Sequence, residues 1–161
     1  MVQWGRCKII VESSISHFDR TLLYGLCSDS KAHTGLMVFY TGLGLPDYCS
    51  AMVRDPSPKC GYIIDREFAS ELQAALRVNP SVHDGAILCG RKSAKNKYRV
   101  AGWSYRLYPP AFSGASIPNK GSALNSGLAM SRVDSVDKVL FWSSGKGWCF
   151  EGGTVLGPIQ G

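Results

Sequence analysis

The polar triplet His83-Asp84-Gly85 directly precedes an apolar run, 86–89, and follows the helix-ending residues Asn79-Pro80-Ser81. Because the run is typical of a buried strand, we expect His83 and Asp84 at the edge of that strand. We expect Gly85 to let the backbone approach a neighbouring group closely. A carboxylate in this position suits contact with a metal ion or a sugar hydroxyl. Asp-Gly is also a common turn signal, so an ordinary turn before a core strand explains the same residues.

A second stretch with chemical potential, 121–131, is rich in small residues and predicts a helix with Ser122 as its N-cap. The N-terminus of such a helix presents unpaired backbone N–H groups and the positive end of the helix dipole, which suits phosphate. Tight packing of the helix on a sheet explains the same composition. Both interpretations therefore remain open at this point.

The composition indicates one globular domain over residues 1–161, with 45% hydrophobic residues and a net charge of +6. A positive charge favours anionic partners, but here it is spread along the chain without a run of five or more basic residues. The densest basic stretch, 91–97, is typical of a solvated hairpin loop. Nucleic acid is therefore not the expected partner, although the charge does not exclude it.

The six cysteines stand singly, without a Cys-x-x-Cys pair, which argues against a zinc site. Cys27 and Cys89 lie in apolar segments and are expected in the core. The sequence has neither the pattern of a signal peptide nor a segment long enough to span a bilayer. We therefore expect a cytoplasmic protein without a membrane partner.

Hydrophobic periodicity predicts strands alternating with helices, and hence an α/β (α+β) fold with a central mixed β-sheet flanked by helices. Helices are expected at 15–28, capped by Ser13-Ser14, at 66–78, capped by Asp65, and from 121. We expect the residues after Gly153 to lie outside regular structure. The expected strands are 7–11, 35–40, a short one near 51–53, 86–90, 98–108 and 138–142, with the return partner of the last beginning at 148–150.

The order of these parts resembles the diadenylate cyclase (DAC) domain, which makes cyclic di-AMP in bacteria. The resemblance covers about residues 15–156, and its most specific part is His83-Asp84-Gly85-Ala86 with the preceding helix. The other matching segments are Gly61-Tyr-Ile-Ile-Asp65, Leu107-Tyr108-Pro109, Gly121-Ser122-Ala123-Leu124-Asn125 and Trp142-Ser143-Ser144.

The resemblance implies a nucleotide site in which Asp84, if the chain is active, acts with a metal ion on the attacking 3′-hydroxyl. It implies His83 and Asp84 as metal ligands, with Mg²⁺ or Mn²⁺ as the cofactor if a nucleoside triphosphate binds. It also implies a homodimer, because family members hold two nucleotides face to face in two subunits. The implied nucleotide-binding residues are Asp84, Gly85, Ala86, Leu107, Tyr108, Gly121, Ser122, Ala123, Asn125 and Ser143.

Two departures from the family affect the chemistry itself. The family's Arg-His-Arg run, which grips triphosphate, falls on Ala123-Leu124-Asn125, and a glutamate that helps to hold the metal falls on Ser144. Phosphoryl transfer relies on positioning and charge neutralisation, and losing one catalytic donor commonly costs a factor of about 10² to 10³. Lys120 or Arg132 could supply charge from nearby, but the sequence places neither.

Three functions are therefore compared. The first is a catalytically degenerate DAC-like domain that binds a nucleotide or cyclic (oligo)nucleotide as a sensor or sequestering module. The second is an active cyclase that makes a cyclic dinucleotide from ATP. The third is a structural or interaction module without a ligand. The sequence favours the first, because the scaffold is kept while the triphosphate grip is lost.

Overall fold

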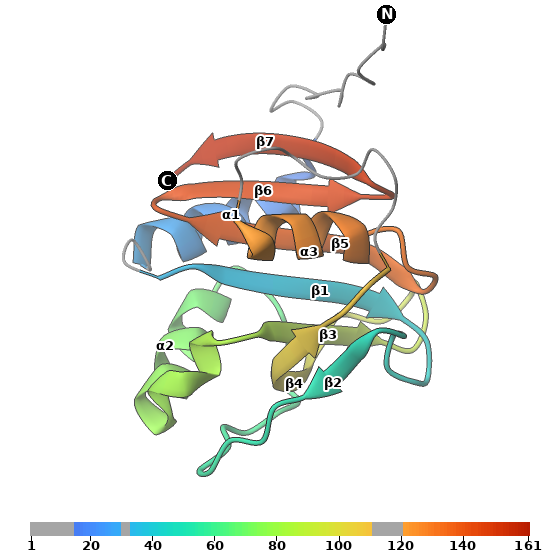
Figure 1. The fold of residues 1–161 in the computed structure, drawn as a ribbon. Helices are drawn as coiled ribbons and strands as arrows, with labels where there is room; N and C mark the ends of the chain where they lie inside the picture. The colour runs from blue at the N-terminus through green and yellow to red at the C-terminus, as the bar shows by residue number, and fades with distance from the viewer. Residues whose placement is uncertain (1–14, 30–32, 111–120) are drawn as a thin grey trace, which may run out of the picture.

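The computed structural model describes residues 15–29, 33–110 and 121–161. The central strand, β1, has three strands on either side of it in the order β2-β4-β3-β1-β5-β6-β7 (Figure 1). The helices are α1 (His17–Asp29), α2 (Phe68–Val78) and α3 (Ser122–Met130), with a 3₁₀ turn, η2 (Pro80–His83). The strands are β1 (Gly35–Thr41), β2 (Cys49–Ala51), β3 (Ala86–Arg91), β4 (Arg99–Leu107), β5 (Val136–Ser143), β6 (Lys146–Glu151) and β7 (Thr154–Gln160).

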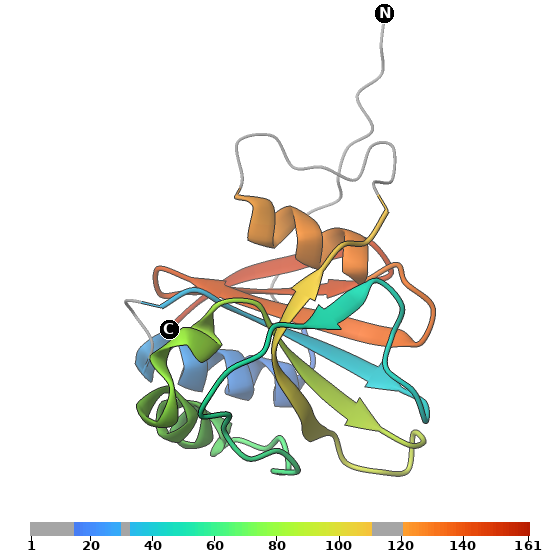
Figure 2. The ribbon, with the colours of Figure 1, turned by 60° about the horizontal axis from the view of Figure 1, so that its bottom comes forward.

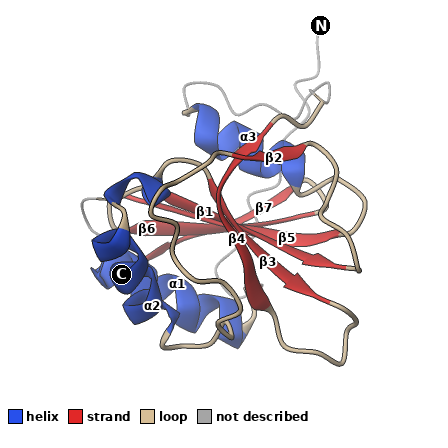
Figure 3. Cartoon of the chain, turned by 90° about the horizontal axis from the view of Figure 1, so that it is seen from below, coloured by secondary structure: helices blue, strands red, loops and turns tan. Residues whose placement is uncertain are grey.

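Strands β1 and β3 run parallel, and the other neighbouring pairs are antiparallel, so the sheet is mixed. Helices α1 and α2 cover one face, and α3 covers the other (Figures 2 and 3). The side chains of β1 alternate accordingly: Met37 and Phe39 pack with α1 and α2, whereas Leu36 and Val38 pack with α3. The fold class predicted from the sequence is confirmed.

Most predicted elements are present with small shifts at their ends. The apolar run 35–40 forms the fully buried middle of the sheet, and Cys27 and Cys89 are buried as expected. The short strand predicted near 51–53 lies at 49–51. Helix α2 begins at Phe68 with Glu67 at the N-cap position, while the carboxylate of Asp65 accepts a hydrogen bond from the Glu67 N–H at 2.9 Å. Asp65 therefore orders the turn before the helix rather than capping it.

Three other expectations need comment. The predicted strand at 7–11 and the cap at Ser13-Ser14 lie outside the described residues. In the described part of helix α1, the Ser16 hydroxyl accepts from the Asp19 N–H at 3.1 Å, as an N-cap does. The expectation that residues after Gly153 lack regular structure is wrong, because 154–160 form β7. Gly157 and Pro158 weaken the strand signal, but an edge strand tolerates a proline.

No helix among the described residues is long and apolar enough to cross a membrane.

Candidate functional site

A cavity of about 250 Å³ lies at the amino ends of β1 and β3, against the N-terminus of α3. We call it the amino-end pocket. Residues in or directly beside four strands, β1, β2, β3 and β4, meet the start of α3 there. Its lining residues are Thr34, Gly35, Leu36, Met52, His83, Gly85, Ala86, Tyr105, Arg106, Leu107, Ser122, Ala123 and Ser126.

The amino-end pocket brings together two stretches that the sequence analysis selected separately. Six of the predicted site residues line it: His83, Gly85, Ala86, Leu107, Ser122 and Ala123. The other predicted site residues are not in the lining, namely Asp84, Tyr108, Gly121, Asn125 and Ser143. The residues directly before β3 and the first residues of α3 thus line the same cavity.

The predicted residues outside the lining take different positions. Tyr108 is exposed beside Leu107, with its ring edge-on to Tyr48. Gly121 is the N-cap of α3, and Asn125 follows in the first turn. The Ser143 hydroxyl lies 2.9 Å from that of Thr34, so it contacts the pocket through a lining residue.

The carboxylate of Asp84 lies on the surface, with its side chain 63% exposed. Its Oδ2 is 4.0 Å from the Arg54 guanidinium, and its Oδ1 is 3.3 Å from His83 Nε2. Arg54 is held in turn, because its Nε donates to the Ser104 hydroxyl at 3.2 Å. Each carboxylate oxygen of Asp84 therefore already faces a side-chain nitrogen.

The imidazole of His83 has one nitrogen committed to the backbone. Its Nδ1 lies 2.5 Å from the Pro80 carbonyl oxygen, which can only accept, so Nδ1 carries the hydrogen and donates. Nε2 then remains as the ring nitrogen that faces Asp84. This places the two predicted metal ligands next to each other.

A metal ion held here would have few protein ligands. Among the described residues, the cluster of three metal-ligating side chains is Asp19, Cys149 and Glu151, and it does not include His83 or Asp84. One imidazole nitrogen and one carboxylate suit Mn²⁺ better than Mg²⁺, which prefers oxygen ligands. The remaining ligands would have to come from water or from ligand phosphates.

Gly85 has φ of +86°, a conformation that other residues adopt only with strain. A Cβ at this position would lie 2.8 Å from the Tyr105 carbonyl oxygen and 3.0 Å from its nitrogen. The close approach expected of Gly85 is therefore made to the backbone of β4, with Met52 alongside. Gly85 thereby lets β4 supply pocket residues next to the start of β3.

The prediction that Ser122 caps α3 is wrong. Gly121 occupies the N-cap position with extended backbone (φ −60°, ψ 160°), and no side chain makes a capping hydrogen bond there. Ser122 is already the first helical residue, so its hydroxyl lies at the pocket wall instead. Gly121, as the N-cap, has no side chain to offer the early N–H groups of α3, and N–H groups of this kind suit water or an anionic ligand.

Sequence reasoning missed Arg106, a lining residue of the amino-end pocket near the end of β4. Arg106 is exposed and directly precedes the predicted residue Leu107, so its neighbourhood was the signal that could have identified it. The sequence analysis named two other basic residues, Lys120 and Arg132, as sources of positive charge near the site. Lys120 lies outside the described residues, and Arg132 follows the C-terminal end of α3 and packs on Gly153.

Comparison with known proteins gives a likeness of fold. No protein-family model matches the chain, and no curated protein matches it. The crystal structure of a hypothetical membrane spanning protein from Bacillus cereus, determined in structural genomics, is similar with a TM-score of 0.58 and 20% sequence identity. The match covers 89% of this chain but only 62% of that one. At this identity, the similarity supports the shared fold alone.

Proposed function

We propose that the chain binds a nucleotide or cyclic nucleotide in the amino-end pocket, as a sensor or sequestering module, without efficient cyclase activity. The observation that carries the proposal is the shared cavity: the residues before β3 and the first turn of α3 line one space of about 250 Å³. This volume is slightly below the lower end of the range for small-molecule pockets, about 300 Å³. It suits one nucleotide unit.

Each part of the pocket offers a different contact. The uncapped N-terminus of α3 and the guanidinium of Arg106 suit a phosphate, by backbone N–H groups and by charge. The hydroxyls of Ser122 and Ser126 suit further polar groups of the ligand. Tyr105 and Leu107 offer apolar surface for a base. Tyr108, exposed beside them, is a further stacking surface.

The absence of efficient catalysis follows from the residues at the same place. Ala123-Leu124-Asn125 carry no positive charge where the resembling family has Arg-His-Arg. Arg54 and His83 lie against both oxygens of Asp84. The positive charge of Arg54, 4.0 Å from Asp84 Oδ2, opposes a metal cation at this carboxylate, and in-line phosphoryl transfer depends on that metal.

Titration calorimetry with ATP, cyclic di-AMP and cyclic oligonucleotides tests the proposal. We expect one of them to bind, and Arg106→Gln to weaken its binding by about tenfold because a charge-assisted contact to phosphate is lost. Arg77→Gln is the matched control, since it removes the same charge from the exposed last turn of α2, and Arg77 lines neither this pocket nor the cavity at the other end of the sheet. Binding that is unaffected by Arg106→Gln, or no binding of any nucleotide, contradicts the proposal.

Incubation with ATP and Mn²⁺ distinguishes a binding protein from a cyclase. We expect no cyclic dinucleotide by chromatography. A product that disappears in Asp84→Ala would instead establish the cyclase alternative. The homodimer implied by the resemblance is tested by sedimentation with and without the bound nucleotide.

A further inference from the structure

A second cavity, of about 450 Å³, lies at the opposite ends of the parallel strands, where β1 and β3 finish and β4 begins. We call it the hairpin cavity. Its lining contains the basic side chains Arg91, Lys92, Lys97 and Arg99 and no carboxylate. We propose that the hairpin cavity binds a small anion carrying two or more phosphate groups. This site is separate from the nucleotide site proposed above.

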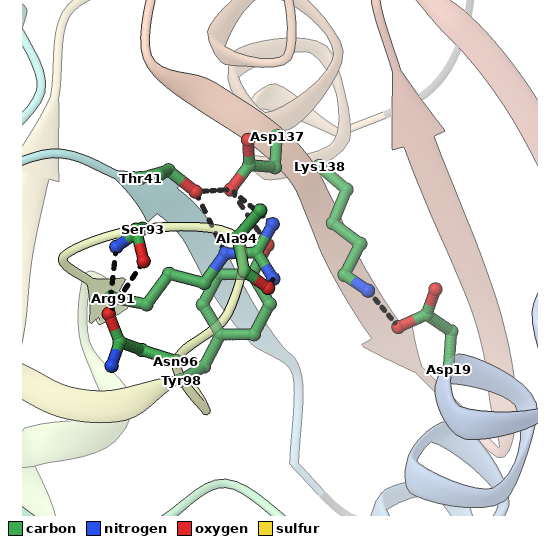
Figure 4. Close-up of polar contacts among 9 residues, drawn as sticks. All are labelled: Asp19, Thr41, Arg91, Ser93, Ala94, Asn96, Tyr98, Asp137 and Lys138. Atoms are coloured by element: carbon green, nitrogen blue, oxygen red, sulfur yellow. Dashed lines mark hydrogen bonds and ion pairs between the residues drawn. The ribbon is translucent and has the colours of Figure 1, made fainter.

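The loop that carries these side chains has a defined conformation (Figure 4). The Asn96 side-chain oxygen accepts from the Ser93 N–H at 3.0 Å and from the Ser93 hydroxyl at 2.9 Å. The Asn96 N–H donates back to the Ser93 carbonyl at 3.0 Å. The turn between Lys92 and Lys97 is therefore closed by its own hydrogen bonds, which fixes the backbone positions from which the two lysine side chains extend.

Arg91 fixes this turn to the sheet. Its Nε donates to the Thr41 hydroxyl at 2.9 Å, its guanidinium carbon lies 4.2 Å from the centre of the Tyr98 ring, and its Nη2 is 3.8 Å from Asp137. The charge of Arg91 is thus largely balanced by Asp137. Arg91 acts as an anchor, and the anion is held by the other cations.

Lys92 and Lys97 make no ion pair within the described part of the chain, and both are exposed. Arg99 donates from Nη1 to the Gly61 carbonyl at 3.0 Å, which orients its guanidinium and leaves its other nitrogens for a ligand. Unbalanced like charges on one cavity repel each other, so an anion between them relieves that repulsion. Three such cations suit a ligand with more than one phosphate.

The neutral wall of the cavity also suits an anion. A Cβ at Gly90 would lie 2.6 Å from the Tyr40 hydroxyl, so the glycine makes room for that phenol at the cavity. Burial raises the pKa of Tyr40, with nearby Cys89 adding to the effect, so its hydroxyl keeps its proton and can donate. Gly42 and Gly61 leave open space where side chains would otherwise narrow the cavity.

The cavity favours a small ligand over a nucleic acid strand. Binding of single-stranded nucleic acid relies on exposed aromatic rings that stack with bases. The aromatic residue in this lining, Tyr40, is only 5% exposed and offers no ring face. A compact polyphosphate fits both the charge and the volume of about 450 Å³.

The test is calorimetric titration of the full chain with sodium tripolyphosphate at low salt. We expect binding that weakens by at least about tenfold in the double variant Lys92→Ser/Lys97→Ser, because two charge-assisted contacts are lost. Lys95→Ser is the matched control, because Lys95 is on the same turn but does not line the cavity. It should change the affinity by less than about twofold. Lys92→Arg/Lys97→Arg should retain binding.

Three outcomes would overturn the proposal: no binding of tripolyphosphate, an equal loss in Lys95→Ser, or tight binding of an oligothymidine that tripolyphosphate does not displace. An equal loss in Lys95→Ser would mean that the anion is attracted by the overall surface charge and not by this cavity. Tight binding of the oligothymidine would mean that the surface binds nucleic acid. Arg106→Gln separates this site from the amino-end pocket, because it should weaken the nucleotide but leave tripolyphosphate binding intact.

Discussion

The two ends of the parallel pair β1 and β3 are built from different chemistry. At the amino ends, the pocket is made of small side chains, backbone N–H groups at the start of α3, and Arg106. At the carboxyl ends, the cavity is lined by four basic side chains, two on either side of the closed turn between β3 and β4. The lining residues predicted as a nucleotide site and the basic cluster beside β3 therefore lie at opposite ends of the same two strands.

The difference concerns how each end would recognise phosphate. Backbone N–H groups act over a short range and are little affected by salt, whereas exposed lysines act over about 10 Å and are screened by salt. The amino-end pocket combines the geometry of the α3 N-terminus with one cation, Arg106, whereas the hairpin cavity depends on several cations. A change in backbone packing should therefore damage the first more than the second.

The ends are also stabilised differently. Near the carboxyl ends, the carboxylate of Asp19 is 1% exposed and lies 2.6 Å from Lys138 Nζ, which also sits above the Phe39 ring (Figure 4). At the amino ends, the close contact is between Gly85 and the backbone of Tyr105. Four substitutions test this contrast.

The largest effect is expected at the buried ion pair. Lys138→Met should lower the free energy of unfolding by about 3 kcal/mol, because the buried carboxylate of Asp19 loses its partner. Denaturant unfolding measures this. The double variant Asp19→Leu/Lys138→Met should recover part of the loss, since it removes the orphaned charge. A loss below about 1 kcal/mol in the single variant would mean that solvent reaches the pair.

The next effect is expected at the amino-end pocket. Gly85→Ala should lower the free energy of unfolding by about 2 kcal/mol, because its Cβ meets the Tyr105 backbone and its positive φ becomes strained. Gly44→Ala is the control, as nothing lies within 4 Å of the added Cβ. Thermal unfolding of both variants measures the difference. Equal melting temperatures would show that the backbone contact at Gly85 is not tight.

A smaller and pH-dependent effect is expected at Tyr98. Its hydroxyl donates to Asp137 at 2.7 Å, and burial together with that carboxylate raises the pKa of Tyr98 well above its usual 10.0. Above pH 10 the unfolded chain releases this proton and the folded chain keeps it, so stability falls as the pH rises. Tyr98→Phe should cost about 1 kcal/mol at neutral pH.

The same variant should show a shallower loss of stability above pH 10 than the parent chain, because the group that titrates in the unfolded state is gone. Unfolding midpoints measured from pH 7 to 11 give both slopes. Parallel slopes would mean that Tyr98 keeps its ordinary pKa.

The smallest effect is expected at Ser143, a predicted site residue that contacts Thr34 through an exposed hydrogen bond. Ser143→Ala should change the free energy of unfolding by less than about 0.5 kcal/mol. It should also leave nucleotide affinity within about twofold, since Ser143 does not line the pocket. A larger loss of affinity would place Ser143 in direct contact with the ligand.

The sequence predicted the fold class because its signals are local. The continuous apolar run at 35–40 indicated a buried strand, and the spacing of Leu22 and Leu26 indicated a helix face. The prediction of secondary structure failed where the local preference of the residues disagreed with the tertiary structure. Gly157 and Pro158 oppose strand formation locally, yet β7 is stabilised by pairing with β6 at the edge of the sheet.

The candidate site was predicted in part for the same reason. The triplet before β3 and the start of α3 were each visible as local patterns, and both line the amino-end pocket. Arg106 was not identified, because its only local signal was its position next to Leu107, and the cavity that it lines is formed by residues from distant parts of the chain. Nor could the sequence reveal that Arg54 lies 4.0 Å from Asp84, since the two residues come from separate parts of the chain.

By itself, the sequence determined most of the segments that form helices and strands, with β7 as the exception, through periodicity and turn residues that act over a few positions. The tertiary structure alone decided the strand order, the pairing of β7, the cavity shared by β3 and α3, and the separate basic cavity at the other end of β1. The reason is that sheet pairing and cavities arise from contacts between residues far apart in the chain, and a local pattern does not specify its distant partner.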